Sequence, residues 1–366
     1  MTGKYVLYGA EFSLYSGKAR SYLRYKRIPF DEVLSSLQVY RKIIIPNTGV
    51  RFIPVVKTPA GEYLQDTSHI IDTLETAFVE RPVLPATPRQ RLASLLLELY
   101  GDEWLLMPAM HYRWNHDNLP FIYDEFGRML FPRWPGFVQR VMGKRVAARF
   151  SGLLPRLGIS DANRDAIEDW FENDFLSALN EHFTNHAFLF GGHPTIGDFG
   201  LIGPMYAHLY RDPAPGKIMR EIAPNVAAWV ERMNKAGDIS GDLLAGDTVP
   251  ESLTPVFRRM FDEHWPVLTD TAIQLGNWAQ EHSGSEVPRI IGEHRFSIGG
   301  VTETRAILPH SIWKMQRPLD YYRSLSGADK QQTDEFLQDV GGLDALQFQP
   351  PVVLSRVNNK LTLASG

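Results

Sequence analysis

The first 80 residues carry a hydrophobic and polar pattern that alternates between strand-like runs and helical spacing. A β-branched and aromatic run over residues 5–8 ends at a glycine and predicts a strand. Apolar residues recur at helical spacing over residues 16–27, and this helix should end at Ile28-Pro29, because proline disfavours the α conformation of the preceding residue. Residues 30–34 then predict a second strand.

The pattern continues with a second helical segment and a hairpin. Residues 39–45 precede Pro46-Asn47-Thr48-Gly49, a cluster of turn formers that predicts a break. Residues 53–56 and 62–64 are predicted as strands joined by a tight turn. Good N-cap residues at 66–68 then start a helix with apolar positions up to residue 78. The resulting order, β-α-β-α-β-β-α, is the thioredoxin-like arrangement.

A proline-rich joint at residues 82–88 separates this unit from a long helical region. Helical spacing begins at Leu92, and no strand pattern competes with the further helices that we expect over residues 137–150, 161–183, 195–210 and 226–233. Beyond Pro250 another helical stretch, residues 255–281, precedes a glycine-containing segment that suggests a small hairpin at 296–300. We therefore predict an α/β domain (residues 1–80), an all-α domain (89–240) and a folded C-terminal extension (241–366).

Composition agrees with more than one domain and narrows the class of partner. A chain of 366 residues exceeds what one hydrophobic core usually organises. The formal net charge of −4 offers no broad attraction to nucleic acid or to anionic membranes, so neither is an expected partner. No apolar stretch approaches the length of a transmembrane helix. The N-terminus leads into a strand without the pattern of a secretory signal, and we therefore expect a cytoplasmic location.

The chain contains no cysteine, which excludes disulfides, thiolate metal ligands and a cysteine nucleophile. Any sulfur chemistry must therefore use a sulfur that belongs to another molecule. His111, His116, His193 and His208 do not have the spacing of a recognised metal site, and we predict that the protein holds no metal.

Three motifs, in this order and spacing, resemble those of the glutathione S-transferase superfamily. They are Ser13-Leu14-Tyr15-Ser16 before a helix with a basic start, Ile53-Pro54, and Gln65-Asp66-Thr67-Ser68. Leu14 departs from the family pattern, in which proline is common at this position. A fourth motif, Thr195 to Gly200, resembles the folding motif of the family's helical domain, with Thr195 and Asp198 as a helix capping box. The resemblance covers about the first 235 residues, and the rest looks like the C-terminal addition of a long-chain subfamily.

The resemblance implies that glutathione is the co-substrate. A cis proline at Pro54 would expose the backbone of Ile53 to glutathione's cysteinyl unit, and Gln65, Asp66 and Thr67 would hold its γ-glutamyl group. Pro54 could instead be an ordinary trans proline, and Asp66 and Thr67 could simply cap a helix.

The glycyl carboxylate of glutathione would need a cation. Arg51 is a candidate, with Arg41 and Lys42 nearby, although a solvated basic face is the commoner explanation for such residues.

The chemical centre that we predict is the turn at residues 13–16. A free thiol has a pKa of about 8.5, so the protein must stabilise the thiolate of glutathione at neutral pH. A hydroxyl at a helix N-terminus can donate a hydrogen bond to sulfur, while the helix dipole favours the negative charge. Ser13 is the best candidate by its alignment with the family turn, and Tyr15, Ser16 and Tyr8 compete with it. The alternative is that Ser13 only caps the helix.

The helical domain should supply a pocket for an electrophile. Met110, His111, Tyr112 and Trp114 could form its wall, although most of them could equally be core. We also hypothesise that residues 307–322 of the extension close over this pocket.

The sequence thus predicts a glutathione transferase that acts on a hydrophobic electrophile and forms a homodimer, as is usual for the superfamily. A glutathione-dependent lyase that cleaves ethers or halides is the alternative among enzymes. A non-catalytic glutathione-binding or scaffold protein is the rival from another class. Thiol–disulfide exchange is disfavoured, because it normally needs a protein cysteine.

Overall fold

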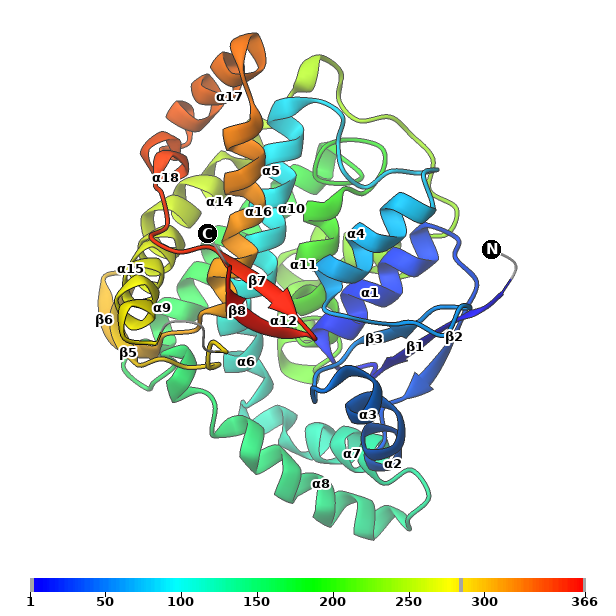
Figure 1. Ribbon diagram of the computed structural model, residues 1–366. Coiled ribbons are helices and arrows are strands. Elements are labelled where there is room, and N and C mark those ends of the chain that lie inside the picture. Colours follow the sequence, from blue (N-terminus) through cyan, green and yellow to red (C-terminus); the bar gives the residue numbers. More distant parts are fainter. Residues whose placement is uncertain (1–2, 283–285, 365–366) are drawn as a thin grey trace.

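The computed structural model describes residues 3–282 and 286–364. Its first part is a four-stranded sheet with helices on both faces (Figure 1). The strands lie in the order β2-β1-β3-β4, with β1 and β2 parallel and the other two pairings antiparallel. The elements are β1 (Tyr5–Gly9), α1 (Leu14–Tyr25), β2 (Phe30–Leu34), α2 (Leu37–Val39), α3 (Ile45–Thr48), β3 (Val55–Lys57), β4 (Tyr63–Gln65) and α4 (Thr67–Ala77). The predicted thioredoxin-like order is confirmed.

The two faces of this sheet are covered by different elements. On one face Leu7 and Val56 belong to the large core that includes residues of α1 and α4. On the other face Tyr8 and Val55 form a small separate core with Ile44. Alternate residues of a strand point to opposite faces, which is why Leu7 and Tyr8 belong to different cores.

The predicted break at residues 46–49 is wrong in its position. The chain stays helical through Thr48, and the helix ends at Gly49, whose φ of 71° is left-handed. Pro46 lies in the first turn of α3, where a proline is tolerated. Glycine adopts the left-handed conformation of a helix C-cap without steric cost.

The second part is helical, as predicted. It comprises α5 (Pro88–Leu99), α6 (Leu106–Arg113), α7 (Leu119–Leu130), α8 (Gly136–Ser151), α9 (Arg164–Asp169), α10 (Ser177–Asn185), α11 (Ile196–Ala207), α12 (Pro213–Ile222) and α13 (Pro224–Lys235). Helix α11 is buried along nearly its whole length and packs against α1 and α5. It starts at the predicted capping box, in which Thr195 and Asp198 exchange hydrogen bonds. Trp229 Nε1 also donates to Asp198, 3.1 Å away, so the same carboxylate joins α11 to α13.

Close approach of α5 and α11 depends on a glycine. A Cβ atom at Gly200 would lie 2.4 Å from the Cα of Glu98. Only glycine therefore permits this contact, which packs the end of α5 that carries Glu98 tightly against α11.

The C-terminal extension packs on both preceding parts. Its elements are α14 (Thr254–Arg259), α15 (Trp265–Glu281), β5 (Glu293–Ile298), β6 (Val301–Ala306), α16 (His310–Ser324), α17 (Gly327–Asp339), α18 (Leu343–Gln347), β7 (Leu354–Val357) and β8 (Lys360–Leu363). The predicted hairpin at 296–300 is confirmed as β5–β6, which turns through Gly299 and Gly300 at positive φ. The sequence analysis missed α16, α17 and the β7–β8 hairpin.

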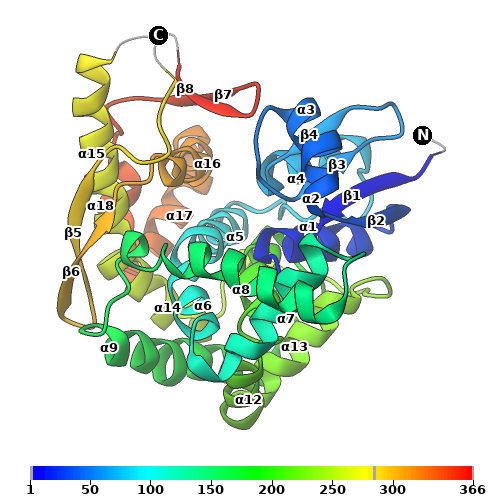
Figure 2. The same cartoon turned by 90° about the horizontal axis from the view of Figure 1, so that it is seen from below.

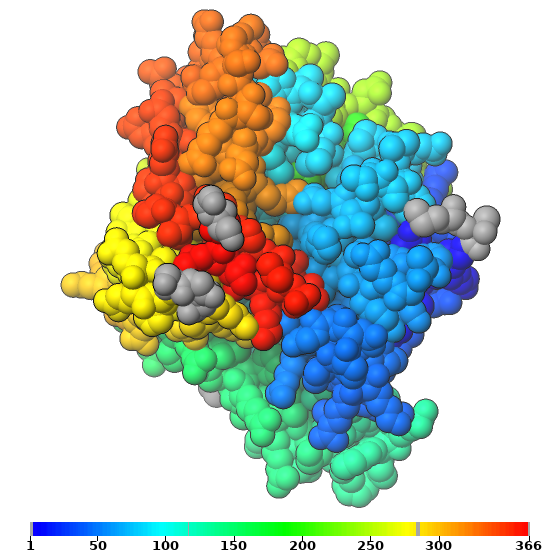
Figure 3. Space-filling model, viewed as in Figure 1, coloured from blue at the N-terminus to red at the C-terminus, as the bar shows by residue number. Residues whose placement is uncertain are grey.

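The extension lies against the thioredoxin-like part as well as the helices. Helix α16 packs beside α5, and the turn of the β7–β8 hairpin points toward α3 (Figure 2). Asn359 in that turn donates to the carbonyl of Thr48, 3.0 Å away. In the space-filling view the red C-terminal surface adjoins the blue surface of the first 80 residues (Figure 3).

Two searches of the structure gave no result. Within residues 3–282 and 286–364, none of the helices combines the length and apolar character needed to span a bilayer. The same residues contain no grouping of three or more His, Asp or Glu side chains suited to a metal ion.

Candidate functional site

Ser13 is the N-cap of α1. Its backbone is extended (φ −89°, ψ 122°), and its hydroxyl oxygen accepts a hydrogen bond from the Ser16 amide at 3.4 Å. A hydroxyl that accepts at its oxygen still has its own proton to donate. Ser13 is half-buried at the N-terminus of a 12-residue helix, where the unpaired amides and the dipole favour an anion.

Two buried arginines hold the loop that precedes α1. Arg113 donates to the carbonyl of Phe12 at 2.8 Å and is itself held by a two-point ion pair with Asp212. Arg20 donates to the carbonyl of Ala10 at 3.3 Å. Both contacts fix main-chain atoms within three residues of Ser13, so they restrict where its hydroxyl can lie.

The competing hydroxyls are engaged elsewhere. Tyr15 donates its proton to the carbonyl of Asp102 at 3.0 Å, and burial together with nearby carboxylates raises the pKa of its phenol well above the ordinary value. Ser16 is fully buried, and its hydroxyl accepts from the Ala10 amide at 3.3 Å. Tyr8 lies in the small core on the other face of the sheet. The geometry therefore favours Ser13 as the hydroxyl donor at this turn.

The peptide bond between Ile53 and Pro54 is cis, as the family resemblance implies. Pro54 is buried, and Ile53 packs against the apolar cluster that contains Phe12. Arg51 is exposed. The guanidinium group of Arg289, from the extension, lies 5.2 Å from the ring centroid of the neighbouring Phe52.

Asp66 is the N-cap of α4, with a left-handed φ of 77°, and its Oδ1 accepts from the Ser68 amide at 2.9 Å. Two cations of the extension face the same carboxylate. His310 Nε2 lies 3.3 Å from Oδ2, and Lys314 Nζ lies 3.5 Å from Oδ1.

The neighbours of Asp66 are also in place. Arg356 donates to the main-chain carbonyl of Gln65 at 3.1 Å and to its side-chain oxygen at 2.5 Å. Thr67 is buried in the first turn of α4. The sequence analysis missed all three cations of the extension that contact this region.

These cations belong to a buried ion network. Lys314 donates to Ser68 at 2.7 Å and to Asp102 at 2.9 Å. Lys18, on α1, lies 2.7 Å from the same oxygen of Asp102 and 2.7 Å from Glu98. The network therefore joins α1, α4 and α5 with the residue that follows α5 and with α16, which come from all three predicted parts of the chain.

The charges in this network reinforce one another. Burial raises the pKa of Asp66, but Lys314 and His310 outweigh it and hold the pKa well below its usual range. Burial also lowers the pKa of His310, but its bonds to Asp66 and Glu103 prevail and raise it to about 9. Arg317 and the two lysines lower the pKa of Glu98 to about 2 against the opposite effect of burial. At neutral pH these groups are all charged.

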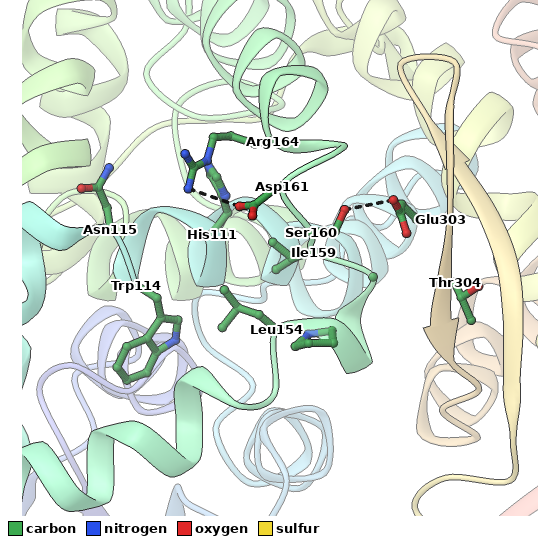
Figure 4. Close-up of a pocket in the computed structure, with 12 residues that line it drawn as sticks. His111, Trp114, Asn115, Leu154, Ile159, Ser160, Asp161, Arg164, Glu303 and Thr304 are labelled. Carbon is green, nitrogen blue, oxygen red and sulfur yellow. Dashed lines mark hydrogen bonds and ion pairs between the residues drawn. The ribbon is translucent and has the colours of Figure 1, made fainter.

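A separate pocket of about 430 Å³ lies between the helical part and the β5–β6 hairpin (Figure 4). It is lined by His111, Trp114, Asn115, Leu154, Pro155, Gly158, Ile159, Ser160, Asp161, Arg164, Glu303 and Thr304. His111 and Trp114, two of the predicted wall residues, thus meet in one cavity. The other two, Met110 and Tyr112, are buried in the main core.

The pocket has an apolar and a polar side. Leu154 and Ile159 lie on the side of Trp114 in Figure 4. On the polar side His111 Nε2 is 2.8 Å from Glu168, and the Ser160 hydroxyl donates to Glu303 at 3.0 Å. Such a mixture suits a ligand with an aromatic or aliphatic body and a hydrogen-bonding end.

Trp114 connects this pocket to the Ser13 loop through stacked rings. Its ring stacks on Phe126 at 6.3 Å, and Phe126 contacts Phe12 edge-on at 4.9 Å. Phe12 immediately precedes Ser13 in the chain.

The segment 307–322 has its polar contacts on the other side of the site. Its residues His310, Lys314 and Arg317 contact α4 and the end of α5. The extension residues that line the pocket are instead Glu303 and Thr304 of β6.

Comparison with known families agrees with this architecture. Residues 7–82 match the model of the glutathione S-transferase N-terminal domain, and residues 173–232 match that of the glutathione S-transferase C-terminal domain. Both domains occur in the family order, on a thioredoxin-like sheet followed by helices. The chain therefore belongs to the glutathione S-transferase superfamily.

Solved structures resemble the chain over about two thirds of its length. A glutathione transferase from Phanerochaete chrysosporium is 14% identical, with 66% of this chain and 99% of that chain covered and a TM-score of 0.45. A protein from Pseudomonas syringae described as similar to glutathione S-transferases is 18% identical, with coverages of 67% and 78% and a TM-score of 0.42. A glutathione S-transferase from Methylobacterium radiotolerans, solved with glutathione sulfonate, is 19% identical, with coverages of 68% and 100% and a TM-score of 0.38. No curated protein matches the chain.

Proposed function

We propose that this protein is a glutathione-dependent transferase that uses the thiolate of bound glutathione to attack a hydrophobic electrophile. The observation that carries the proposal is the position of Ser13 at the N-cap of α1. Its hydroxyl accepts from the helix and retains a proton to donate. The cis bond between Ile53 and Pro54 lies in the same domain, as the family arrangement requires.

The chemistry follows from the pKa of a thiol. At about 8.5 only a few per cent of free glutathione is thiolate at neutral pH. A hydrogen bond from Ser13 and the amides of the first turn of α1 stabilise the anion, so the thiol loses its proton to solvent at lower pH. The sulfur then forms a bond to the electrophilic carbon, and its electron pair displaces the leaving group or adds to the activated bond.

The γ-glutamyl group lies at Gln65, Asp66 and Thr67 in this proposal, and the cysteinyl main chain lies along Ile53. Arg51, which is exposed, is the proposed partner of the glycyl carboxylate. No metal takes part in this proposal.

The second substrate occupies the pocket beside Trp114. The stacked rings of Trp114, Phe126 and Phe12 lead from this pocket to the residue before Ser13. The pocket is open to an aromatic or aliphatic group against Leu154 and Ile159.

A second candidate is a non-catalytic protein that has kept the fold. The observation in its favour is that Lys314 and His310 already face Asp66, the carboxylate that would hold the ammonium group of glutathione. Superfamily folds host many functions, so the distinction must be measured.

The deciding experiment is a titration of the purified protein with glutathione by calorimetry, followed by a pH titration of the thiolate absorbance of the complex. A transferase binds glutathione and lowers its thiol pKa below about 8.5. A protein that has only kept the fold does neither, and that result would refute the proposal. The homodimer and the cytoplasmic location stay predictions, and the molar mass in solution tests the first of them.

A further inference from the structure

The family resemblance assigns the ammonium group of glutathione to Asp66, but the C-terminal extension already supplies cations to that carboxylate. Lys314 Nζ is 3.5 Å from Oδ1, and His310 Nε2 is 3.3 Å from Oδ2. The Asp66 side chain is only 12% exposed. Each of its oxygens therefore faces a cation of the same chain.

His310 is a bridge between two carboxylates. Its second ring nitrogen, Nδ1, lies 3.3 Å from Glu103 Oε1. A histidine whose two nitrogens both face carboxylate oxygens donates from both, which requires the protonated imidazolium form. The imidazolium thus occupies the space between Asp66 and Glu103, where an ammonium group would otherwise be held.

Lys314 cannot easily leave Asp66, because its ammonium group has other buried partners. It donates to Ser68 at 2.7 Å and to Asp102 at 2.9 Å, and its side chain is almost fully buried. An ammonium group from a ligand would therefore approach Asp66 against the like charge of Lys314 and of His310. Like charges at such short range repel strongly where water is largely excluded.

The charge that this end of the site offers to a ligand is positive. The side chain of His310 is 41% exposed, so it is accessible to a ligand as well as to its two carboxylate partners. Arg356 lies on Gln65 and is also partly exposed. Thr67 adds the amide of the first turn of α4, which favours an anion.

We propose that the C-terminal extension changes which charge of the γ-glutamyl group is recognised. The α-carboxylate binds to His310, Arg356 and the start of α4, while the α-ammonium group contributes little, since Lys314 and His310 stand in for it on Asp66. The substrate class is then a γ-glutamyl thiol peptide with or without a free α-amine. This inference rests on the proposed function, because it concerns the same glutathione site.

The test compares three peptides by calorimetry on the full-length protein. They are glutathione, glutathione acetylated on its α-amine, and glutathione whose γ-glutamyl α-carboxylate is converted to the primary amide. We expect the acetylated peptide to bind within about threefold of glutathione, and the amide to bind at least about tenfold more weakly, as the loss of a charge-assisted hydrogen bond implies.

The possible failures are distinguishable. If glutathione binds and the acetylated peptide binds more than about tenfold more weakly, the ammonium group is recognised and the inference is wrong. If none of the three peptides binds, the proposed function fails and the inference fails with it.

A variant adds a readout that a merely structural role would not change. His310→Ala removes the bridge and leaves Asp66 and Glu103 able to accept an ammonium group. We expect the ratio of affinities, glutathione over its acetylated form, to rise about tenfold in this variant. An unchanged ratio in a folded His310→Ala protein would contradict the role given to His310.

The matched control is Arg323→Gln. It removes a cation from the same helix, 13 residues or about 20 Å further along, and Arg323 contacts Asp320 and the carbonyl of Phe348 rather than the site. Its affinity ratio should equal that of the wild type. A shift as large as in His310→Ala would mean that the ratio reports general charge and would overturn the inference.

Discussion

Lys314 and Asp102 lie 2.9 Å apart, Nζ to Oδ2, although 212 positions separate them in the chain. The same oxygen accepts from Lys18 at 2.7 Å. One carboxylate at the end of the first helix of the all-α part therefore joins α1 of the thioredoxin-like part to α16 of the extension. The extension is fastened to the two family domains by buried charge, and its removal would leave that charge uncompensated.

Replacing Lys314 by Met should destabilise the whole protein. The methionine has similar length but leaves Asp66 and the Ser68 hydroxyl without their buried cation. We expect the free energy of unfolding to fall by about 3 kcal/mol, as when one partner of a buried ion pair is removed. Unfolding in urea, followed by fluorescence and circular dichroism, measures the change.

The control for this variant is Lys217→Met, which removes a lysine whose side chain is 74% exposed and whose pair with Glu221 is long, at 3.9 Å. Its cost should stay below about 0.5 kcal/mol. Equal losses in the two variants would show that the buried network adds nothing to stability.

Stability should also decrease at alkaline pH because of His310. Its pKa is raised to about 9 in the folded protein, above the unfolded value of about 6.5, so the folded chain binds more protons between these values. The contribution is fully present below pH of about 6.5 and is lost as the pH rises through about 9. We expect a loss of at most about 1 kcal/mol, because solvent screens a side chain this exposed.

The pH effect is isolated by comparison with His310→Gln. Urea unfolding at intervals between neutral pH and pH of about 10 gives one stability curve for each protein, and their difference should shrink as the pH rises. The groups that face His310 are Asp66, Glu103, Trp313 and Lys314. Parallel curves would mean that His310 is not protonated preferentially in the fold.

The first 80 residues could be predicted because their signals are local. The strand from Tyr5, the cap at Asp66 and the hairpin at Thr58 to Gly61 each depend on a few adjacent residues. The break at residues 46–49 was misplaced for the same reason: the turn formers are there, but Gly49 alone ends the helix. Local composition could not show that Pro46 lies in the first turn of α3.

The contacts of the extension could not be predicted, because they join residues that are far apart in sequence. His310, Lys314 and Arg317 are spaced at four and three residues, so they lie on one face of a helix. That spacing was a usable signal for a cationic face. Nothing local in the chain indicates that the partners of this face are Asp66 and Asp72.

The wall of the electrophile pocket shows the same limit within a single helix. Met110, His111, Tyr112 and Trp114 were grouped by sequence, but only His111 and Trp114 line the pocket. These two are three residues apart and share a face, whereas the side of α6 that meets the core depends on the packing of the whole helical part.

The proposed thiolate stabilisation by Ser13 predicts a specific kinetic defect. Ser13→Ala should keep its affinity for glutathione but return the thiol pKa of the complex to about 8.5. We expect kcat/KM to fall about 100-fold, as when a preorganised hydrogen-bond donor to a developing anion is removed. The thiolate absorbance of the complex and steady-state kinetics with an aromatic electrophile measure the two effects.

The control for Ser13→Ala is Ser13→Thr, because threonine keeps both the hydroxyl and the ability to cap a helix. Its thiol pKa should stay close to that of the wild type. If Ser13→Ala turns over at the wild-type rate, the hydroxyl of Ser13 takes no part in the reaction. The loss of the cap alone, about 1 kcal/mol of stability, would not change the pKa of the thiol.

Trp114 gives the last test, because it belongs to the pocket and not to the glutathione subsites. Trp114→Ala removes an aromatic wall and opens the side of the pocket that faces Phe126. We expect KM for an aromatic electrophile to rise about tenfold, which corresponds to losing about 1.4 kcal/mol of apolar contact, while the affinity for glutathione stays the same. Trp134→Ala is the matched control, since Trp134 is half-exposed on the chain between α7 and α8 and lies outside the pocket. A rise in KM of equal size for both variants would place the electrophile elsewhere in the protein.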